Sequence, residues 1–364
     1  MSTSVFRHTG ACPAAAPNSI NAVLSTAARL HSHQAFRQLA RHRICHHNNS
    51  HAATRRHFSH TRTLRDDRAA DLNDHDLTKL GRTLSNEFAH LREKYDTPRY
   101  PIVLAHGLLG FAELKLAANY LPPIHYWRGI QEALTAQGCE VITATVPASG
   151  TIEHRAAKLG EDIARQCNGK AVNIVAHSMG GLDARYMISQ LQPKDVDVKS
   201  LVTVATPHHG SAVADWLMDE IGPDRLPKLY RAWERVTGLD SGAFAQLRTG
   251  YMNKEFNPRT PDDPSVRYFS YGAYMNTPPP LLSPFRWSHK VLEQLEGPND
   301  GLVSVESSKW GTHKGSLVGV NHLDLINWTN RLRWTVLRWM GRERPFNAIA
   351  FYLDIADMLA KEGL

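Results

Sequence analysis

Long apolar runs are missing from this chain. No stretch of its 364 residues approaches the roughly 18 consecutive apolar residues that a membrane-spanning helix needs. Cysteine is scarce too, because two of the four lie near the N-terminus and only Cys139 and Cys167 follow. Two cysteines cannot build a disulfide scaffold, and they fit a reducing compartment. The sequence therefore predicts neither a transmembrane protein nor a small disulfide-stapled domain.

Acidic residues are absent from the first 64 residues, which carry eight Arg and no Lys. Removing these eight from the 42 basic residues of the chain leaves 34, against 35 Asp and Glu. The formal charge of +7 therefore belongs to this segment. The remainder is close to neutral and gives no reason to expect a nucleic-acid partner.

Residues 1–64 have the composition of a mitochondrial transit peptide. Apolar residues between Ile20 and Leu39 recur at helical spacing with arginines among them, and no continuous apolar core of a secretory signal is present. The run from Arg56 to Ser59 resembles a mitochondrial processing site. We therefore expect a disordered or cleaved leader and a protein of the mitochondrial matrix or inner-membrane surface. The alternative is a disordered basic tail on a cytoplasmic protein.

A strand, a sharp turn and a helix follow one another around Ser178. Val172 to Ala176 reads as a buried strand, and Met179 begins a helical pattern. Ala176 and Gly180 are small enough for the tight turn that holds a nucleophilic serine in the pattern G-x-S-x-G, although the first glycine is here alanine. This context predicts a nucleophile elbow rather than a surface serine in a glycine-rich turn.

Strand and helix patterns alternate on both sides of the elbow. They predict one α/β domain over residues 98–364, with a mostly parallel central sheet and helices on both faces. Residues 65–97 are expected to form a linker and an edge helix, with an apolar stripe from Leu72 to Leu91. Residues 212–264, approximately, lack strand signals and are predicted to form an inserted helical cap.

A serine needs a histidine to take its proton and a carboxylate to orient that histidine. In the α/β-hydrolase fold these residues follow in the order Ser, acid, His. His322 is favoured because Ser316 to Val320 reads as the last strand, which places His322 in the loop at the active edge of the sheet. The other histidines after Ser178 lie too early in the chain or in polar stretches: His208, His209, His289 and His313.

Asp300 is the favoured acid. It lies in a tight loop, Gly297 to Val303, 22 residues before His322. The alternative is a plain Asp-Gly turn. Asp183 is expected on the elbow helix and pointing away, and Asp324 comes after the histidine. The remaining candidates fall in the predicted cap or in a proline-flanked turn: Asp215, Asp219, Asp224, Asp240, Asp262 and Asp263.

Six stretches together resemble the triacylglycerol lipases of the bacterial Pseudomonas and Burkholderia group and their fungal mitochondrial relatives. They are Tyr100 to Gly110, Tyr126 to Ile130, Val172 to Gly181, Thr206 to Ser211, Asn299 to Val303 and Asn321 to Asp324. The resemblance implies Ser178, Asp300 and His322 as the triad, with the N–H groups of Leu108 and Met179 as the oxyanion hole. It also implies an α/β-hydrolase fold with a mobile helical lid over an acyl-chain groove.

The expected function is hydrolysis of long-chain acylglycerol esters through an acyl-enzyme, at a lipid–water interface and with peripheral membrane contact. No cofactor is expected. A phospholipase or acyltransferase on the same fold is an alternative, because the triad does not choose among these chemistries. A catalytically silent lipid- or partner-binding protein is the alternative outside enzymes.

The chain differs from its bacterial relatives at two stabilising features, a calcium site and a disulfide. The resemblance implies a calcium ion held by two aspartates; Asp324 supplies one, but Thr277 to Leu282 replaces the other. No acidic residue lies between Asp263 and Glu293, and no cysteine follows Cys167 to form the relatives' disulfide. A single carboxylate should bind calcium poorly, so we expect no metal site.

Overall fold

The computed structural model describes residues 80–85, 87–108, 113–114, 124–221, 242–281, 283, 285–328 and 346–364. All of them belong to one compact unit, Asp67–Leu364. The predicted transit segment, residues 1–64, and the first part of the predicted linker lie outside the described residues.

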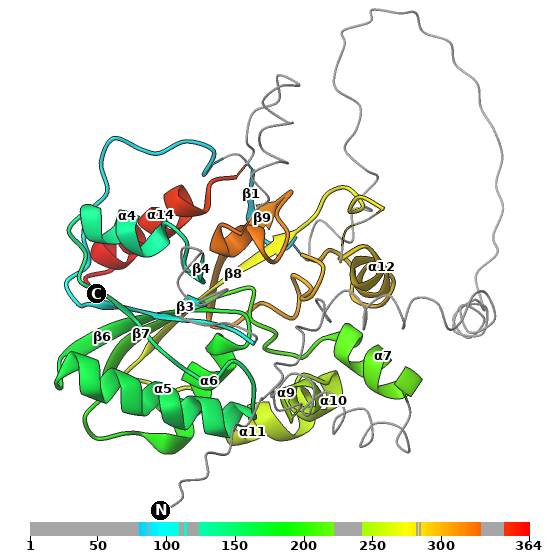
Figure 1. The fold of residues 1–364 in the computed structure, drawn as a ribbon, viewed down its shortest axis with the longest axis horizontal. Helices are drawn as coiled ribbons and strands as arrows, with labels where there is room; N and C mark the ends of the chain where they lie inside the picture. The colour runs from blue at the N-terminus through cyan, green and yellow to red at the C-terminus, as the bar shows by residue number, and fades with distance from the viewer. Residues whose placement is uncertain are drawn as a thin grey trace, which may run out of the picture. The chain divides into compact units, whose positions relative to one another are not determined.

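A seven-stranded sheet runs through the domain in the order β1-β9-β8-β7-β6-β2-β5 (Figure 1). Every neighbouring pair is parallel, which confirms the predicted fold class. The strands are β1 (Thr83–Leu84), β2 (Ile102–Ala105), β5 (Val141–Thr143), β6 (Ala171–His177), β7 (Asp197–Val204), β8 (Arg267–Tyr274) and β9 (Thr312–Val318). A separate antiparallel pair joins β3 (Glu113–Leu114) to β4 (Ile124–His125).

Helices cover both faces of this sheet, as Figure 1 shows. One face carries α5 (Ile152–Cys167) and α6 (Gly180–Tyr186), which continues as the π-helical turn η1 (Met187–Leu191). The other face carries α4 (Ile130–Ala136) and α14 (Ala348–Lys361).

Residues of β2 alternate between the two cores. Ile102 and Leu104 pack in the cluster that contains α4 and α14, whereas Val103 and Ala105 pack in the cluster that contains α5. Full burial of one aliphatic side chain is worth about 1.5–3 kcal/mol, so this alternation fixes the register of the strand. The register in turn fixes where the loops after the strands emerge.

The described part of the predicted cap region is mostly helical up to Arg259. It contains α7 (Ala212–Ile221), α9 (Gly242–Gln246), α10 (Thr249–Tyr251), η2 (Met252–Phe256) and α11 (Asn257–Arg259). Residues 222–241 lie outside the described residues. Helix α7 packs on α12 (Phe285–Leu295), and the rings of Trp216 and Trp287 lie 4.2 Å apart at this contact.

Two local predictions were wrong. Residues 81–91 were expected to continue an edge helix, but Gly81 has φ +64° and the next residues form β1 beside β9. His313 was expected in a polar turn, but it lies within β9 and its ring contacts Ser270 and Ser316. In the described part of the chain, no helix is long and apolar enough to span a bilayer.

Candidate active site

Ser178 occupies a strained turn between β6 and α6. Its φ is +56°, in the left-handed region that side chains rarely adopt. Its N–H donates to the carbonyl of Val204 on β7, and its own carbonyl accepts from the Thr206 hydroxyl at 2.7 Å. A main-chain bond to β7 and a side-chain bond from the loop after it thus hold the serine in this conformation.

The turn needs the two small residues that the sequence provides. A Cβ atom on Gly180 would lie 2.7 Å from the main-chain oxygen of His106, which is closer than real contacts allow. Ala176 is fully buried, so a methyl group fits where the usual pattern has glycine. The steric requirement of a nucleophile elbow is therefore met.

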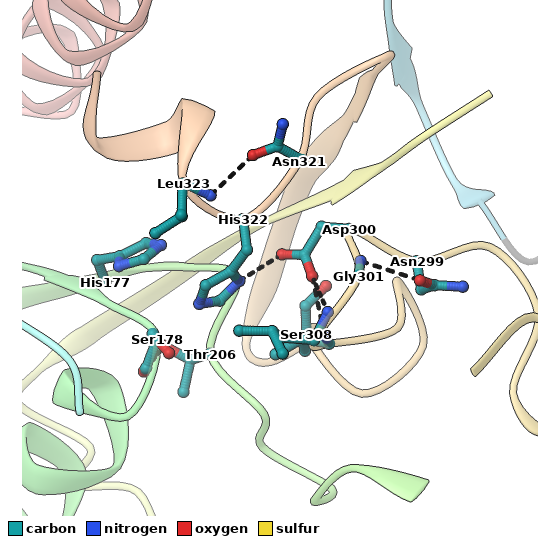
Figure 2. Close-up of polar contacts among 12 residues, drawn as sticks. His177, Ser178, Thr206, Asn299, Asp300, Gly301, Ser308, Asn321, His322 and Leu323 are labelled. Carbon is teal, nitrogen blue, oxygen red and sulfur yellow. Dashed lines mark hydrogen bonds and ion pairs between the residues drawn. The ribbon is translucent and has the colours of Figure 1, made fainter. Parts of the chain in front are cut away.

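Asp300 and His322 are in direct contact. His322 Nδ1 lies 2.6 Å from Asp300 Oδ2, and both side chains are buried. The second carboxylate oxygen accepts the N–H groups of Leu302 at 2.9 Å and Val303 at 2.8 Å. In Figure 2 the imidazole lies between Asp300 and Ser178. The three residues lie after β8, β9 and β6, at the carboxyl edge of the sheet.

Asn299 builds the loop that carries Asp300. Its fully buried side chain accepts the Gly301 N–H at 2.9 Å and donates to the carbonyls of His289 and Gly297. The carbonyl of Asp300 also accepts the His322 N–H at 3.0 Å. The acid is therefore fixed both to its own turn and to the loop of the base.

The loop after β2, residues His106 to Leu108, lies against the elbow. A Cβ atom on Gly107 would lie 2.7 Å from the Ser178 Cβ, so only glycine allows this approach. Among the described residues, the N–H groups of Leu108 and Met179 have no hydrogen-bond partner within the protein. Two unpaired donors beside a serine can donate hydrogen bonds to a developing oxyanion.

A second histidine, His177, lies beside the base and was missed by the sequence reasoning. Its Nδ1 is 2.7 Å from the hydroxyl of Tyr126, which also accepts the Gly107 N–H at 3.2 Å. Burial holds the pKa of His177 well below its usual value, and the nearby His322 lowers it further. The order Ser, acid, His limited the search for the base to histidines after Ser178. The position of His177 in the sequence gave no indication that its ring would lie beside His322.

The other predicted candidates have structural partners. His208 contacts Thr203 through Nε2 at 3.0 Å, and His289 is buried in α12. Asp215 accepts hydrogen bonds from Thr249 in the cap. Asp183 lies on the elbow helix α6, as predicted, and its side chain is buried against Arg155. Asp224 and Asp240 lie outside the described residues.

Asp324, the residue at the position of one calcium ligand in the bacterial relatives, is engaged by its own loop. Its Oδ2 accepts the N–H of Asn321 at 3.2 Å, and the Asn321 side chain accepts the N–H groups of Leu323 and Asp324. No group of three or more His, Cys, Asp or Glu side chains in the described ranges is arranged to hold a metal ion. The residues present do not fit the relatives' calcium site.

Comparison with known proteins gives a consistent picture. The family model described as alpha/beta hydrolase fold matches residues 100–355. Triacylglycerol lipase 2 of Saccharomyces cerevisiae is 35% identical over 316 residues, covering 74% of this chain and 94% of the relative. Triacylglycerol lipase of Pseudomonas fragi is 27% identical over 308 residues, covering 73% and 98%. The crystal structure of Staphylococcus hyicus lipase aligns with TM-score 0.53 and 19% identity over 75% of this chain and 98% of that one, which shows a shared fold.

Proposed function

The chain belongs to the α/β-hydrolase fold family, and we propose that it is a serine lipase that hydrolyses long-chain triacylglycerol and diacylglycerol esters. The contact between Asp300 and His322 beside the strained Ser178 carries this proposal. The names of the yeast and Pseudomonas relatives support the substrate class.

In the proposed mechanism, His322 takes the proton of Ser178 through Nε2 as Oγ attacks the ester carbonyl. Asp300 holds the Nδ1–H of His322, which fixes the tautomer and stabilises the imidazolium. The tetrahedral intermediate collapses to an acyl-enzyme, and His322 returns the proton to the departing glycerol oxygen. Water, activated by the same histidine, then releases the fatty acid.

The N–H groups of Leu108 and Met179 would stabilise the negative oxygen of that intermediate. Their lack of partners among the described residues supports this role. Loss of one such donor typically costs about 3 kcal/mol of transition-state stabilisation, so both must point at the same oxygen.

We propose that the enzyme works at a lipid–water interface and contacts membranes peripherally. Leu302, two residues after the acid, is 37% exposed, and Leu281 and Trp287 are 78% and 37% exposed. Exposed large apolar side chains favour adsorption to lipid. The contact between Trp216 of α7 and Trp287 supports the proposal that the cap helices act as a lid.

We further propose a mitochondrial location, in the matrix or on the inner-membrane surface. Its support is the Arg-rich, acid-free composition of residues 1–64.

An assay of residues 65–364 on emulsions of triacylglycerol, phospholipid and short-chain esters tests the function, with Ser178→Ala as the matched control. We expect Ser178-dependent release of fatty acid from triacylglycerol, with a rise in rate when the substrate passes from monomers to emulsion. Equal or faster turnover of phospholipid would contradict the substrate class. Activity that persists in Ser178→Ala would contradict the mechanism.

A further inference from the structure

We propose that Arg155 and Asp183 form a positioning pair that aligns the loop of Leu108 with the elbow of Met179, so that both N–H groups face one oxyanion. This inference rests on the proposed function. It concerns two residues outside the proposed triad.

The guanidinium of Arg155 makes hydrogen bonds to three segments of the chain. From α5, its Nη2 donates to the carbonyl of His106 at 2.9 Å, and its Nη1 donates to the carbonyl of Pro147. Its Nε and Nη2 lie 2.9 and 2.8 Å from Asp183 Oδ2. The side chains of Arg155 and Asp183 are 0% and 1% exposed. One guanidinium therefore joins three separate segments around the active site.

Two consecutive peptide planes of the loop after β2 are each held by side-chain contacts. The carbonyl of His106 and the N–H of Gly107 belong to one planar group. The carbonyl accepts a hydrogen bond from Arg155, and the N–H donates to the Tyr126 hydroxyl. The next plane contains the Gly107 carbonyl and the Leu108 N–H, and His106 Nδ1 contacts that carbonyl at 3.0 Å. Because each plane is rigid, fixing its carbonyl also directs its N–H.

Asp183 supplies the link to the second donor. It lies on α6, the helix that begins directly after Met179, and it is held to Arg155. The two oxyanion donors lie on different segments, the loop after β2 and the elbow after β6. The pair connects these segments through a forked guanidinium, whose geometry is more specific than that of a lysine.

Stability alone is a weak reason for such a pair. Two charges removed from water lose hydration, and well-packed apolar residues in their place are often as stable or more stable. Burial raises the pKa of Asp183 to about 6 even with Arg155 beside it, and Asp183 Oδ1 has no hydrogen-bond partner among the described residues. A costly pair placed between two oxyanion donors fits a role in alignment.

The test separates alignment from stability. The single variants Arg155→Met and Asp183→Leu should lower both the melting temperature and kcat, because each leaves one buried charge unpaired. The double variant Arg155→Met with Asp183→Leu should recover the melting temperature but keep a loss of about 100-fold in kcat at nearly unchanged KM. Arg165→Met is the matched control, since Arg165 on the same helix is 71% exposed and pairs with Asp162.

A second readout does not depend on the ester. An alkylboronic acid forms a tetrahedral adduct with the active serine, and its affinity reports the oxyanion hole directly. We expect its Ki to rise by about the same factor as kcat falls in the double variant. Recovery of kcat and of boronate affinity together with the melting temperature would show a merely structural pair and overturn the inference.

Arg155→Lys keeps the test decisive if the double variant does not fold. Lysine preserves the charge opposite Asp183 but cannot bind His106, Pro147 and Asp183 together. A near-native melting temperature with weakened boronate binding supports the inference, whereas native boronate binding overturns it. A wild-type protein that binds boronate through Ser178 but does not hydrolyse acylglycerols would refute the proposed substrate alone.

Discussion

The imidazole rings of His177 and His322 lie 4.6 Å apart, with their planes inclined by 45°. A charge on His177 would oppose the charge that His322 acquires when it takes the proton of Ser178. Burial lowers the pKa of His177 well below its usual value, so this neighbour stays neutral. The histidine inside the elbow motif thus packs against the proposed base without competing for its proton.

Asp300→Asn should reduce kcat by about 10³- to 10⁴-fold, because an amide cannot hold the tautomer of His322 that accepts a proton at Nε2. KM should change little, and esterase kinetics on the purified domain would measure both. His313→Gln is the matched control. Comparable loss of kcat in that control would reassign the base.

Tyr126→Phe removes one hydroxyl and leaves the ring packed on Trp127, whose centroid is 5.2 Å away. The Gly107 N–H and His177 Nδ1 would both lose a partner. We expect kcat to fall about 10-fold, equivalent to about 1.4 kcal/mol. An unchanged kcat would show that the loop after β2 is held without this hydroxyl.

The protein should lose stability steeply as the pH falls below 6.5. Burial lowers the pKa of both His106 and His313 to about 4, whereas an unfolded histidine titrates near 6.5. Between these pH values each of these histidines is protonated in the unfolded chain but neutral in the folded one. Each therefore lowers the free energy of unfolding by about 1.4 kcal/mol per pH unit as the pH falls. Denaturant melts of wild type and His313→Gln at pH 7, 6 and 5 test this. The variant should show a shallower loss, and parallel curves would contradict the assignment.

Excess EDTA and dithiothreitol should each leave the melting temperature and activity unchanged. The loop of Asp324 is closed by Asn321, and Cys139 and Cys167 are both free and buried. Differential scanning fluorimetry with and without each reagent is sufficient. A drop on chelation that added calcium reverses would reveal a site built from other oxygens.

Residues 1–64 fused to a fluorescent protein should direct it to mitochondria, because import receptors read an amphipathic, Arg-rich helix. The matched control changes Arg29, Arg37 and Arg41 to Glu, which retains length and apolar spacing. The control should remain diffuse. A diffuse wild-type fusion would refute the location.

The sheet was predictable because its strands are buried on both sides and read as short apolar runs. Ser178 and His322 could be chosen for the same reason, since each follows such a run. The start of β9 was harder to predict, because its first three residues are polar: Thr312, His313 and Lys314. Helix α12 was missed, because it follows a proline-rich segment and mixes Arg, Lys and Glu with its apolar side.

Contacts between distant residues could not be read from spacing. Arg155 and Asp183 are 28 positions apart, and Tyr126 and His177 are 51 apart. Neither pair forms a local motif. The first pair forms where α5 packs on α6, and the second joins the segment before α4 to the end of β6. Local patterns therefore predicted the framework and the contact between Asp300 and His322, but not the contacts that Arg155 and Tyr126 make with the loop after β2.

The order in which the strands follow one another along the chain also keeps the protein inactive while it is being synthesised. The serine follows β6 near the middle of the sheet, but the proposed acid and base arrive only after β8 and β9, more than 120 residues later in the chain. A ribosome-bound chain lacks the complete proposed triad until β9 has paired with β8. A lipase built in this way cannot hydrolyse lipid before its last strands have folded.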